Sequence, residues 1–257
     1  MLKDLIKSGY RNAPLFVAIH GVEGCGKTTF AGGAPAPLFL DFEQGTNFQN
    51  TSRIHPESYK HCTDILTMLE TEDHQFQTLV IDSMDFAEVM MTDYVAKRHG
   101  KPTMEAFAYG SGYKHLAKEF ISFLTKLESL RTNRQMNIII IAHSLVKKFE
   151  DPRLDQGYDR YTIKLYHANA ERLKEACDFL LFATFKDKLS DEQNNRRIGQ
   201  LGVRKLMTER RPAYDAKSRT FLPEELDMSW NAFYSAIYPG QPQVNTQPQQ
   251  QAPQQSQ

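Results

Sequence analysis

The sequence predicts an α/β fold in three layers, with a mostly parallel central sheet covered by helices on both faces and a β-hairpin region near the C-terminus. One observation is that short, continuously apolar segments alternate with helix-compatible segments along the chain, as strands buried on both faces of a parallel sheet do. Another is that several of these segments end in polar residues, and ligands bind at the carboxyl ends of parallel strands. The 257 residues suffice for one such domain, which we expect to span 1–238.

Apolar runs and amphipathic spacing place the individual elements in chain order. A helix begins at Lys27 and stops at Gly32 and Gly33, and a long helix over 113–131 has its apolar residues on one face. The predicted strands cover 16–20, 37–41, 78–82, 137–144 and 179–184. The other predicted helices cover 59–70, 84–98 and 168–177, and the closing hairpin is expected to pair 198–207 with 213–221.

The turn after the first strand carries the most specific motif. It reads Gly21-Val22-Glu23-Gly24-Cys25-Gly26-Lys27-Thr28-Thr29 and matches the phosphate-binding loop pattern G-x-x-x-x-G-K-[ST]. Its glycines allow successive backbone N–H groups to point inward around phosphate oxygens. Lys27 brings a charge to the β- and γ-phosphates, and the Thr28 hydroxyl can ligate Mg²⁺. We therefore expect residues 21–29 to bind a nucleotide.

Carboxylates that follow two of the predicted strands are candidates for the metal ligand and the base. Asp82 follows four apolar residues downstream of the loop, where a Walker B carboxylate holds Mg²⁺ directly or through water. The next residue is Ser83, so a base directly beside Asp82 is missing. We expect Glu43 to orient the attacking water, with Asp41 as the competing candidate.

The order of these motifs resembles the RecA-like ATPase core. In that family a catalytic glutamate ends the second core strand, the Walker B strand ends Asp-Ser, and a polar residue senses the γ-phosphate at the end of the next strand. The resemblance implies ATP as the nucleotide and assigns the sensor position to His143, where RecA- and DnaB-type proteins usually carry Gln. Lys217 and Arg219 resemble the Lys-x-Arg element that reaches a neighbour's γ-phosphate, which implies a homo-oligomeric ring or filament.

A narrower resemblance, over about residues 14–226, is to small phage-encoded RecA-like ATPases of single-strand annealing recombination. It rests on Ala142-His143-Ser144, on Tyr109-Gly110 before the long helix, and on Lys217-Ser218-Arg219 followed by Leu222-Pro223. The resemblance implies ATP-dependent binding and pairing of single-stranded DNA, beside a single-strand DNA-binding protein.

Basic segments give this DNA expectation candidate residues. In RecA-like cores, single strands lie along the loops after the Walker B helix and after the sensor strand, and cations interleaved with aromatic residues suit phosphate contacts and base stacking. The candidate DNA-binding residues are Lys97, Arg98, Lys101, Lys147, Lys148, Arg153 and Arg160. A further basic patch comprises Arg196, Arg197, Arg204, Lys205, Arg210 and Arg211.

The composition adds few constraints on function. Lys+Arg and Asp+Glu are balanced at 31 each, so the total charge does not by itself indicate nucleic acid. The chain shows no signal peptide and no apolar run long enough for a membrane span, and its three scattered cysteines are typical of a reducing compartment. We expect a cytoplasmic protein, in the host cytoplasm if it is phage-encoded, with a disordered Pro/Gln-rich tail over 239–257.

Three alternatives remain open on the sequence. A DNA helicase or translocase motor uses the same core, although we expect no N-terminal domain before the loop. A nucleoside or nucleotide kinase would need an acceptor pocket and an Arg-rich lid, which segment 147–160 could imitate. A nucleotide-gated binding module would keep the loop and lack turnover.

Overall fold

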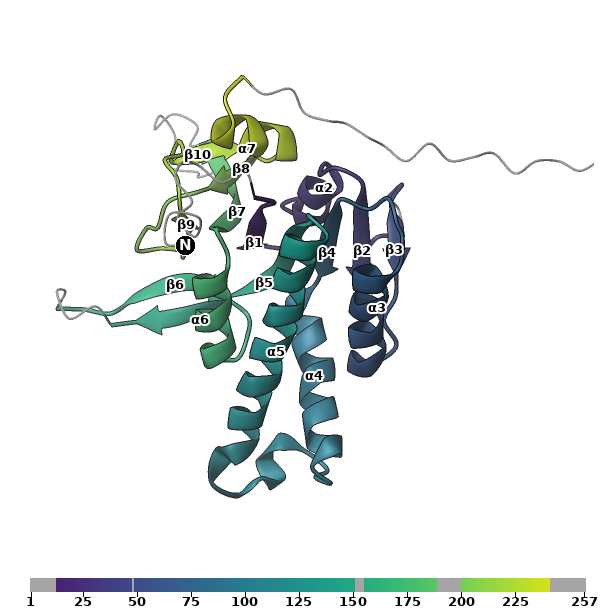
Figure 1. Cartoon of the computed structure of the whole chain (residues 1–257). Helices are drawn as coiled ribbons and strands as arrows, with labels where there is room; N and C mark the ends of the chain where they lie inside the picture. The colour runs from purple at the N-terminus through teal and green to yellow at the C-terminus, as the bar shows by residue number, and fades with distance from the viewer. Residues whose placement is uncertain (1–12, 48, 151–154, 189–199, 241–257) are drawn as a thin grey trace, which may run out of the picture.

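The structure is a computed structural model that describes residues 13–47, 49–150, 155–188 and 200–240 (Figure 1). Arg153, Arg196, Arg197 and most of the predicted tail lie outside these described residues. Among the described helices, none has the length and apolar character that crossing a membrane requires.

A single large sheet in the order β10-β8-β7-β1-β5-β4-β2-β3 forms the middle layer. The strands β3, β2, β4, β5, β1 and β7 run parallel, whereas β8 is antiparallel to both β7 and β10. Two further strands, β6 and β9, pair antiparallel with β5 and β7. The bounds are β1 Phe16–Gly21, β2 Pro37–Asp41, β3 Ser52–Ile54, β4 Thr78–Asp82, β5 Asn137–Phe149, β6 Tyr158–Ile163, β7 Phe179–Lys188, β8 Gln200–Met207, β9 Lys217–Ser218 and β10 Glu225–Asp227.

Helices cover both faces of the sheet, because successive strand residues point to opposite sides. Ala18 and Ile140 pack in one apolar cluster with α3, α4, α5 and α6, whereas Ile19 and Ile139 pack in the other with α2 and α7. The bounds are α2 Lys27–Gly32, α3 Tyr59–Thr71, α4 Met84–Arg98, α5 Ser111–Asn133, α6 His167–Ala176 and α7 Trp230–Ile237, with short 3₁₀ turns at Met104–Ala106 and Ala108–Gly110. The predicted α/β class with a mostly parallel sheet is confirmed.

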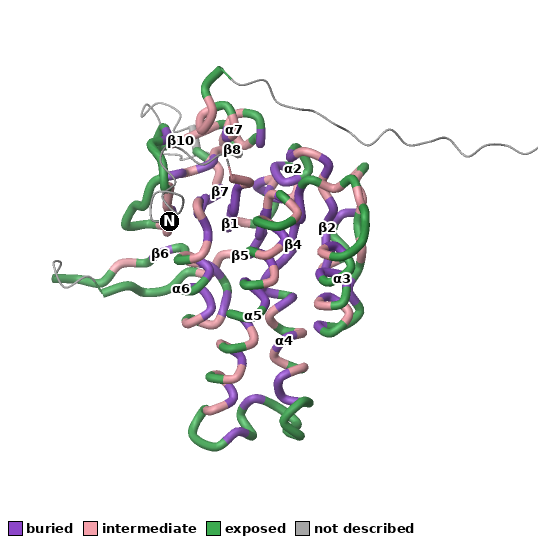
Figure 2. Tube along the Cα trace, in the orientation of Figure 1, coloured by how far each residue is buried: buried purple, intermediate pink, exposed green. Residues whose placement is uncertain are grey.

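Two arms extend beyond the sheet, and both are largely exposed at their ends (Figure 2). One is the connection between α4 and α5, and the other is the ribbon of β5 and β6 (Figure 1). β5 continues to Phe149, past the predicted end at Ser144, because it pairs with β6 from Ser144 onward. The candidate DNA-binding segment after His143 is therefore a two-stranded ribbon in its described part.

The predicted β-hairpin region near the C-terminus is confirmed as a set of antiparallel strands, but its two predicted segments do not pair with each other. β8 pairs with β7 and β10, while the segment 213–221 contributes only the two-residue β9, which pairs with the start of β7. Both edges of β8 are thus occupied by other strands. Apolar runs predict that a strand exists, but its partner is set by contacts distant in sequence.

Candidate active site

The phosphate-binding loop lies where β1 ends between β5 and β7. Gly21 is in register with His143 of β5 and with Ala183 of β7, and a methyl group on Gly21 would lie 2.0 Å from the Ala183 carbonyl oxygen. Gly26 has φ 96°, a left-handed conformation that glycine adopts without strain. The tight strand packing and the backbone angles explain why the loop needs glycine at these positions.

The lysine and threonine of the motif point to the middle of the site. Lys27 is buried, and its Nζ donates to the carbonyl oxygens of Gly21 and Val22 at 3.2 and 3.0 Å. The Thr28 hydroxyl donates to Asp82 Oδ2 at 2.9 Å. The loop and the end of β4 are therefore in direct contact. Of the other loop residues, Glu23, Gly24 and Thr29 are exposed, and Cys25 is buried.

The environment of Asp82 suits a bound cation. Burial raises the pKa of Asp82 to about 6, the hydrogen bond from Thr28 acts against this rise, and the nearby Glu43 and Asp41 add to it. A buried carboxylate among other carboxylates is stabilised by a divalent cation, and carboxylate and hydroxyl oxygens are the ligands that Mg²⁺ prefers. Thr28 and Asp82 therefore fit the role of holding Mg²⁺, directly or through water.

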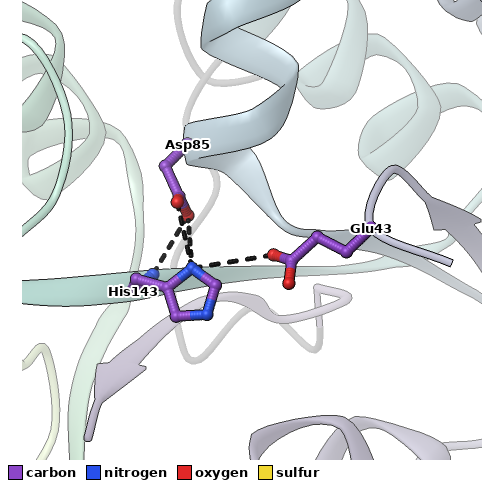
Figure 3. A group of neighbouring side chains, drawn as sticks. All are labelled: Glu43, Asp85 and His143. Carbon is purple, nitrogen blue, oxygen red and sulfur yellow. Dashed lines mark hydrogen bonds and ion pairs between the residues drawn. The ribbon is translucent and has the colours of Figure 1, made fainter. Parts of the chain in front are cut away.

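Glu43, Asp85 and His143 form a cluster of side chains (Figure 3), and the charge of Glu43 acts on Asp82. Glu43 follows β2, Asp85 lies in the first turn of α4, and His143 is on β5 at the carboxyl edge of the parallel strands. His143 Nδ1 lies 3.0 Å from Asp85 Oδ2 and 3.6 Å from Glu43 Oε1, and Glu43 also accepts a short hydrogen bond from the Ser83 hydroxyl. Strand ends that are distant in sequence thus place a carboxylate and an imidazole together.

Asp85 is the residue of this cluster that the sequence analysis missed. Its carboxylate accepts from the backbone N–H of His143 at 3.1 Å and contacts the imidazole. Hydrogen bonding to Asp85 raises the pKa of His143 above its usual value, although partial burial opposes the rise. An Asp three residues after the Walker B Asp was the available signal, but an acid in the first turn of a helix is also common for helix-dipole reasons.

Asp41, the competing candidate base, has both carboxylate oxygens hydrogen-bonded to the loop that follows β2. Its carboxylate accepts from the N–H groups of Gly45 and Thr46 at 3.1 and 3.0 Å and from the Thr46 hydroxyl at 2.6 Å. Burial by itself would raise the pKa of Asp41, but these hydrogen bonds outweigh it and lower the pKa. Asp41 therefore holds the loop that presents Glu43.

The ligand atoms of Glu43, Asp85 and His143 lie within 4.8 Å of one another, close enough to share a metal ion. His143 Nδ1 is the atom that faces both carboxylates, and it is already used in the hydrogen bond to Asp85. The donor set for Mg²⁺ is hence better supplied by Thr28 and Asp82, which are oxygen ligands.

Lys217 and Arg219 lie where the parallel strands begin, at the end of the sheet opposite the loop. Lys217 pairs with Leu180 at the start of β7, and its Nζ donates to the carbonyl oxygens of Lys174 and Cys177 at 2.6 and 2.8 Å. Arg219 donates to the Glu175 carbonyl at 3.0 Å. Both side chains bind the carboxyl end of α6, and the fold does not bring them to the loop of their own chain.

The predicted DNA-binding cations differ in how free they are. Lys97 and Arg98 end α4, and Arg98 pairs with Glu119 at 3.5 Å. Lys147 and Lys148 are exposed on β5, and Lys101 is exposed beyond α4. Arg160 instead is buried: its guanidinium donates to Pro212 O at 2.9 Å, pairs with Asp215 at 3.4 Å and lies 4.3 Å from the centre of the Phe149 ring.

A groove of about 540 Å³ lies between the ribbon, α6 and the segment before β9. Lys147, Lys148 and Arg210 contribute exposed cations to its lining. Lys174 and Asp215, which also line it, pair with each other at 2.6 Å. The Lys and Arg residues of the whole lining outnumber its two carboxylates, Glu171 and Asp215, so the groove is basic.

Comparison with known proteins identifies the family of this chain. A family model described as "AAA domain" matches residues 13–220, and no curated protein sequence matches the chain. Among solved structures, the chain is similar to the RadB recombinase, with 16% sequence identity over 90% of this chain and 94% of that chain and a TM-score of 0.46.

Proposed function

The chain belongs to the AAA-domain family and is a P-loop ATPase of that family, and from this premise we propose that it hydrolyses ATP with Mg²⁺, using Glu43 as the base. The observation that carries the proposal is the meeting of two groups of residues at one edge of the sheet. The Thr28–Asp82 contact at 2.9 Å lies beside Glu43 and His143, whose side chains approach to 3.6 Å.

Each residue has a distinct part in the proposed reaction. Lys27 would supply positive charge to the phosphates, and Thr28 and Asp82 would hold Mg²⁺, which would neutralise charge on the phosphate oxygens. Glu43 accepts a hydrogen bond from the water and orients it toward the γ-phosphate. His143, held by Asp85 in an orientation that leaves Nε2 available, donates a hydrogen bond to the γ-phosphate.

We further propose that hydrolysis is coupled to single-stranded DNA, in recombination of the phage type. Support comes from the resemblance of the motifs and from the exposed Lys147 and Lys148 on the β5–β6 ribbon. The ribbon begins directly after His143, so a strand bound there would be connected to the γ-phosphate sensor through a continuous β-strand.

The first experiment is steady-state ATP turnover without DNA, with single-stranded DNA and with duplex. We expect single strands to stimulate turnover and Lys27→Ala to abolish it, because Lys27 is the phosphate-binding cation. Lys60→Ala is the matched control, since Lys60 is exposed and its ion pair is with the exposed Asp64. Turnover that depends on Lys27 but is indifferent to DNA would contradict the DNA proposal and leave the ATPase intact.

The proposal includes an oligomer in which Lys217 and Arg219 act on the nucleotide of a neighbouring chain. These side chains cannot reach their own loop, because they lie at the start of β7 rather than at its carboxyl end. We expect Arg219→Ala to lose turnover, and a mixture with Lys27→Ala to recover part of it, since some interfaces then pair an intact loop with an intact Arg219. Full turnover of Arg219→Ala alone would contradict this role.

A further inference from the structure

A cation from β8 lies against the phosphate-binding loop. The Nη1 and Cδ atoms of Arg204 would lie 3.4 and 3.7 Å from a methyl group added to Gly26. Gly26 directly precedes Lys27, so the guanidinium is at the centre of the motif. On the sequence, Arg204 belongs to a basic patch with no expected part in nucleotide binding.

The direction of the Arg204 side chain follows from its strand. Leu206, two residues further along β8, is buried in the cluster that contains Cys25 and Phe30. Because residues at i and i+2 of a strand point to the same face, Arg204 must point to the face on which α2 and the loop lie. The backbone, and not a chance side-chain rotamer, directs Arg204 to the loop.

Arg204 has no acidic partner within the described part of the chain. Its side chain makes none of the ion pairs or hydrogen bonds found among those residues and is exposed, whereas the neighbouring Lys205 pairs with Asp227 at 2.9 Å. Burial raises the pKa of the Cys25 thiol, and the charges of Lys27 and Arg204 act against that rise. The charge of Arg204 is therefore felt inside the loop and is not used by a protein carboxylate there.

The strand order shows which part of a nucleotide Arg204 would meet. Asp82 ends β4, Glu43 follows β2 and His143 lies on β5, and these strands are all on one side of β1. Arg204 comes from β8, beyond β7 on the other side. A nucleotide with its terminal phosphate beside Glu43 extends its remaining part across the loop toward β7 and β8. Arg204 is hence on the side of the ribose-linked phosphate, away from the phosphate that is cleaved.

We propose that Arg204 binds the α-phosphate of the nucleotide held in the loop of its own chain. The inference rests on the proposed nucleotide site and adds a residue that serves binding rather than turnover. A guanidinium beside a phosphate forms charge-assisted hydrogen bonds. Since the α-phosphate is unchanged by hydrolysis, the contact stabilises ATP and ADP alike, which raises affinity and leaves the chemical step unaffected.

The test is titration of the full chain with ADP and with a non-hydrolysable ATP analogue, each with Mg²⁺, together with kcat and KM for ATP. We expect Arg204→Ala to weaken the binding of both nucleotides by the same factor, about tenfold. It should also raise KM for ATP and leave kcat unchanged. Arg204→Lys should recover most of the affinity, because the charge is kept. Arg172→Ala is the matched control, since Arg172 is exposed on α6 and pairs with the exposed Glu175.

The outcomes separate the inference from the proposed function. If the wild type binds neither nucleotide, the proposed function fails; if it binds both and Arg204→Ala binds equally well, only the inference fails. A fall in kcat with unchanged affinity would place Arg204 at the γ-phosphate and overturn the inference. No recovery in Arg204→Lys would indicate stacking of the guanidinium plane and would also overturn it.

Discussion

The parallel strands of the sheet begin at one edge, here called the amino edge, and end at the opposite carboxyl edge. Both edges carry charged side chains, but these side chains differ in how many of their hydrogen bonds are made within the chain. At the amino edge, Asp178 accepts from the Phe16 N–H at 3.2 Å and from Arg131 Nη2 at 2.5 Å, and it pairs with Arg219 at 3.3 Å. Arg131 also donates to the Pro14 carbonyl at 2.6 Å. Asp178 and Arg131 are thus bound to the chain's own backbone and to each other, whereas Arg219 keeps a side chain that is more than half exposed.

At the carboxyl edge the charges are only partly satisfied. Among the described residues, neither Glu43 Oε2 nor His143 Nε2 has a hydrogen-bond partner, although the other atom of each side chain is held by Ser83 or by Asp85. Their side chains are 25% and 23% exposed, enough to meet a ligand. The difference shows that polar side chains whose hydrogen bonds are made within the chain, as at the amino edge, stabilise the fold. Side chains with one atom bound and one atom without a partner, as at the carboxyl edge, are held in place and remain available for chemistry.

The largest effect is expected for Glu43→Gln at the carboxyl edge. Turnover should fall by about 100- to 1000-fold, because a positioned base contributes on this scale, while nucleotide affinity stays within about threefold. Steady-state turnover and nucleotide titration measure the two effects. The control is Glu128→Gln, which loses a half-exposed charge beside Arg131 at the amino edge. Turnover of Glu43→Gln equal to that of the wild type would contradict the role of Glu43 as the base.

His20 tests whether the hydrogen-bond partners of a polar side chain matter more than its position at the carboxyl edge. It lies at the carboxyl end of β1, yet it is fully buried, with Nδ1 2.8 Å from Ser144 Oγ and Nε2 2.9 Å from the Asp215 carbonyl oxygen. Burial lowers the pKa of His20 from 6.5 to about 4. Because the unfolded chain binds the proton first, stability is present above pH 6.5 and is lost as the pH falls toward 4.

The loss attributable to His20 should reach roughly 3 kcal/mol at pH 4, at about 1.4 kcal/mol per pH unit. Urea unfolding across this range measures it. His20→Gln, which keeps a hydrogen-bonding side chain and does not titrate, should show a shallower dependence than the wild type. The carboxylates of the chain titrate in both proteins, so they cancel in the difference. Equal slopes would show that His20 does not set the acid stability.

Asp178→Asn should lower the free energy of unfolding by about 2 kcal/mol, since it breaks a largely buried ion pair with Arg131. The exposed pair of Asp64 with Lys60 provides the control, and Asp64→Asn should cost less than about 0.5 kcal/mol. Urea midpoints measure both variants. We expect nucleotide affinity to stay unchanged in Asp178→Asn, and a selective loss of nucleotide binding without loss of stability would overturn the division between the edges.

The smallest effect is expected in the pH dependence of the proposed contact between His143 and the γ-phosphate. The pKa of His143 is raised by its hydrogen bond to Asp85, so the imidazolium persists above the usual value and then loses its charge as the pH rises. The preference for a non-hydrolysable ATP analogue over ADP should therefore fall a few-fold, by about threefold, as the pH rises through the His143 pKa. His143→Gln should show no such change. An equal pH dependence in both proteins would exclude His143 as its source.

The comparison also shows which parts of the site could be predicted from sequence. Glu43, Asp82 and His143 each follow an apolar strand, and because parallel strands end at one edge, their proximity follows from the pattern. Asp85 lies inside a helix and meets His143 only through the packing of α4 against β5, so no local pattern marks it. Arg204 was visible as a basic residue, but its position over Gly26 depends on β8 folding back beside β7.

The sequence by itself determined the local structure: the loop, the buried strands and the helices that cover them, since backbone freedom at glycine and hydrophobic periodicity act over a few residues. Only the tertiary structure decided the partners of β8, the continuation of β5 into a ribbon with β6, and the hydrogen bonds of Lys217 to the end of α6. These features depend on contacts between segments far apart in the chain, where several pairings satisfy the same apolar pattern and the packing of the whole sheet selects one.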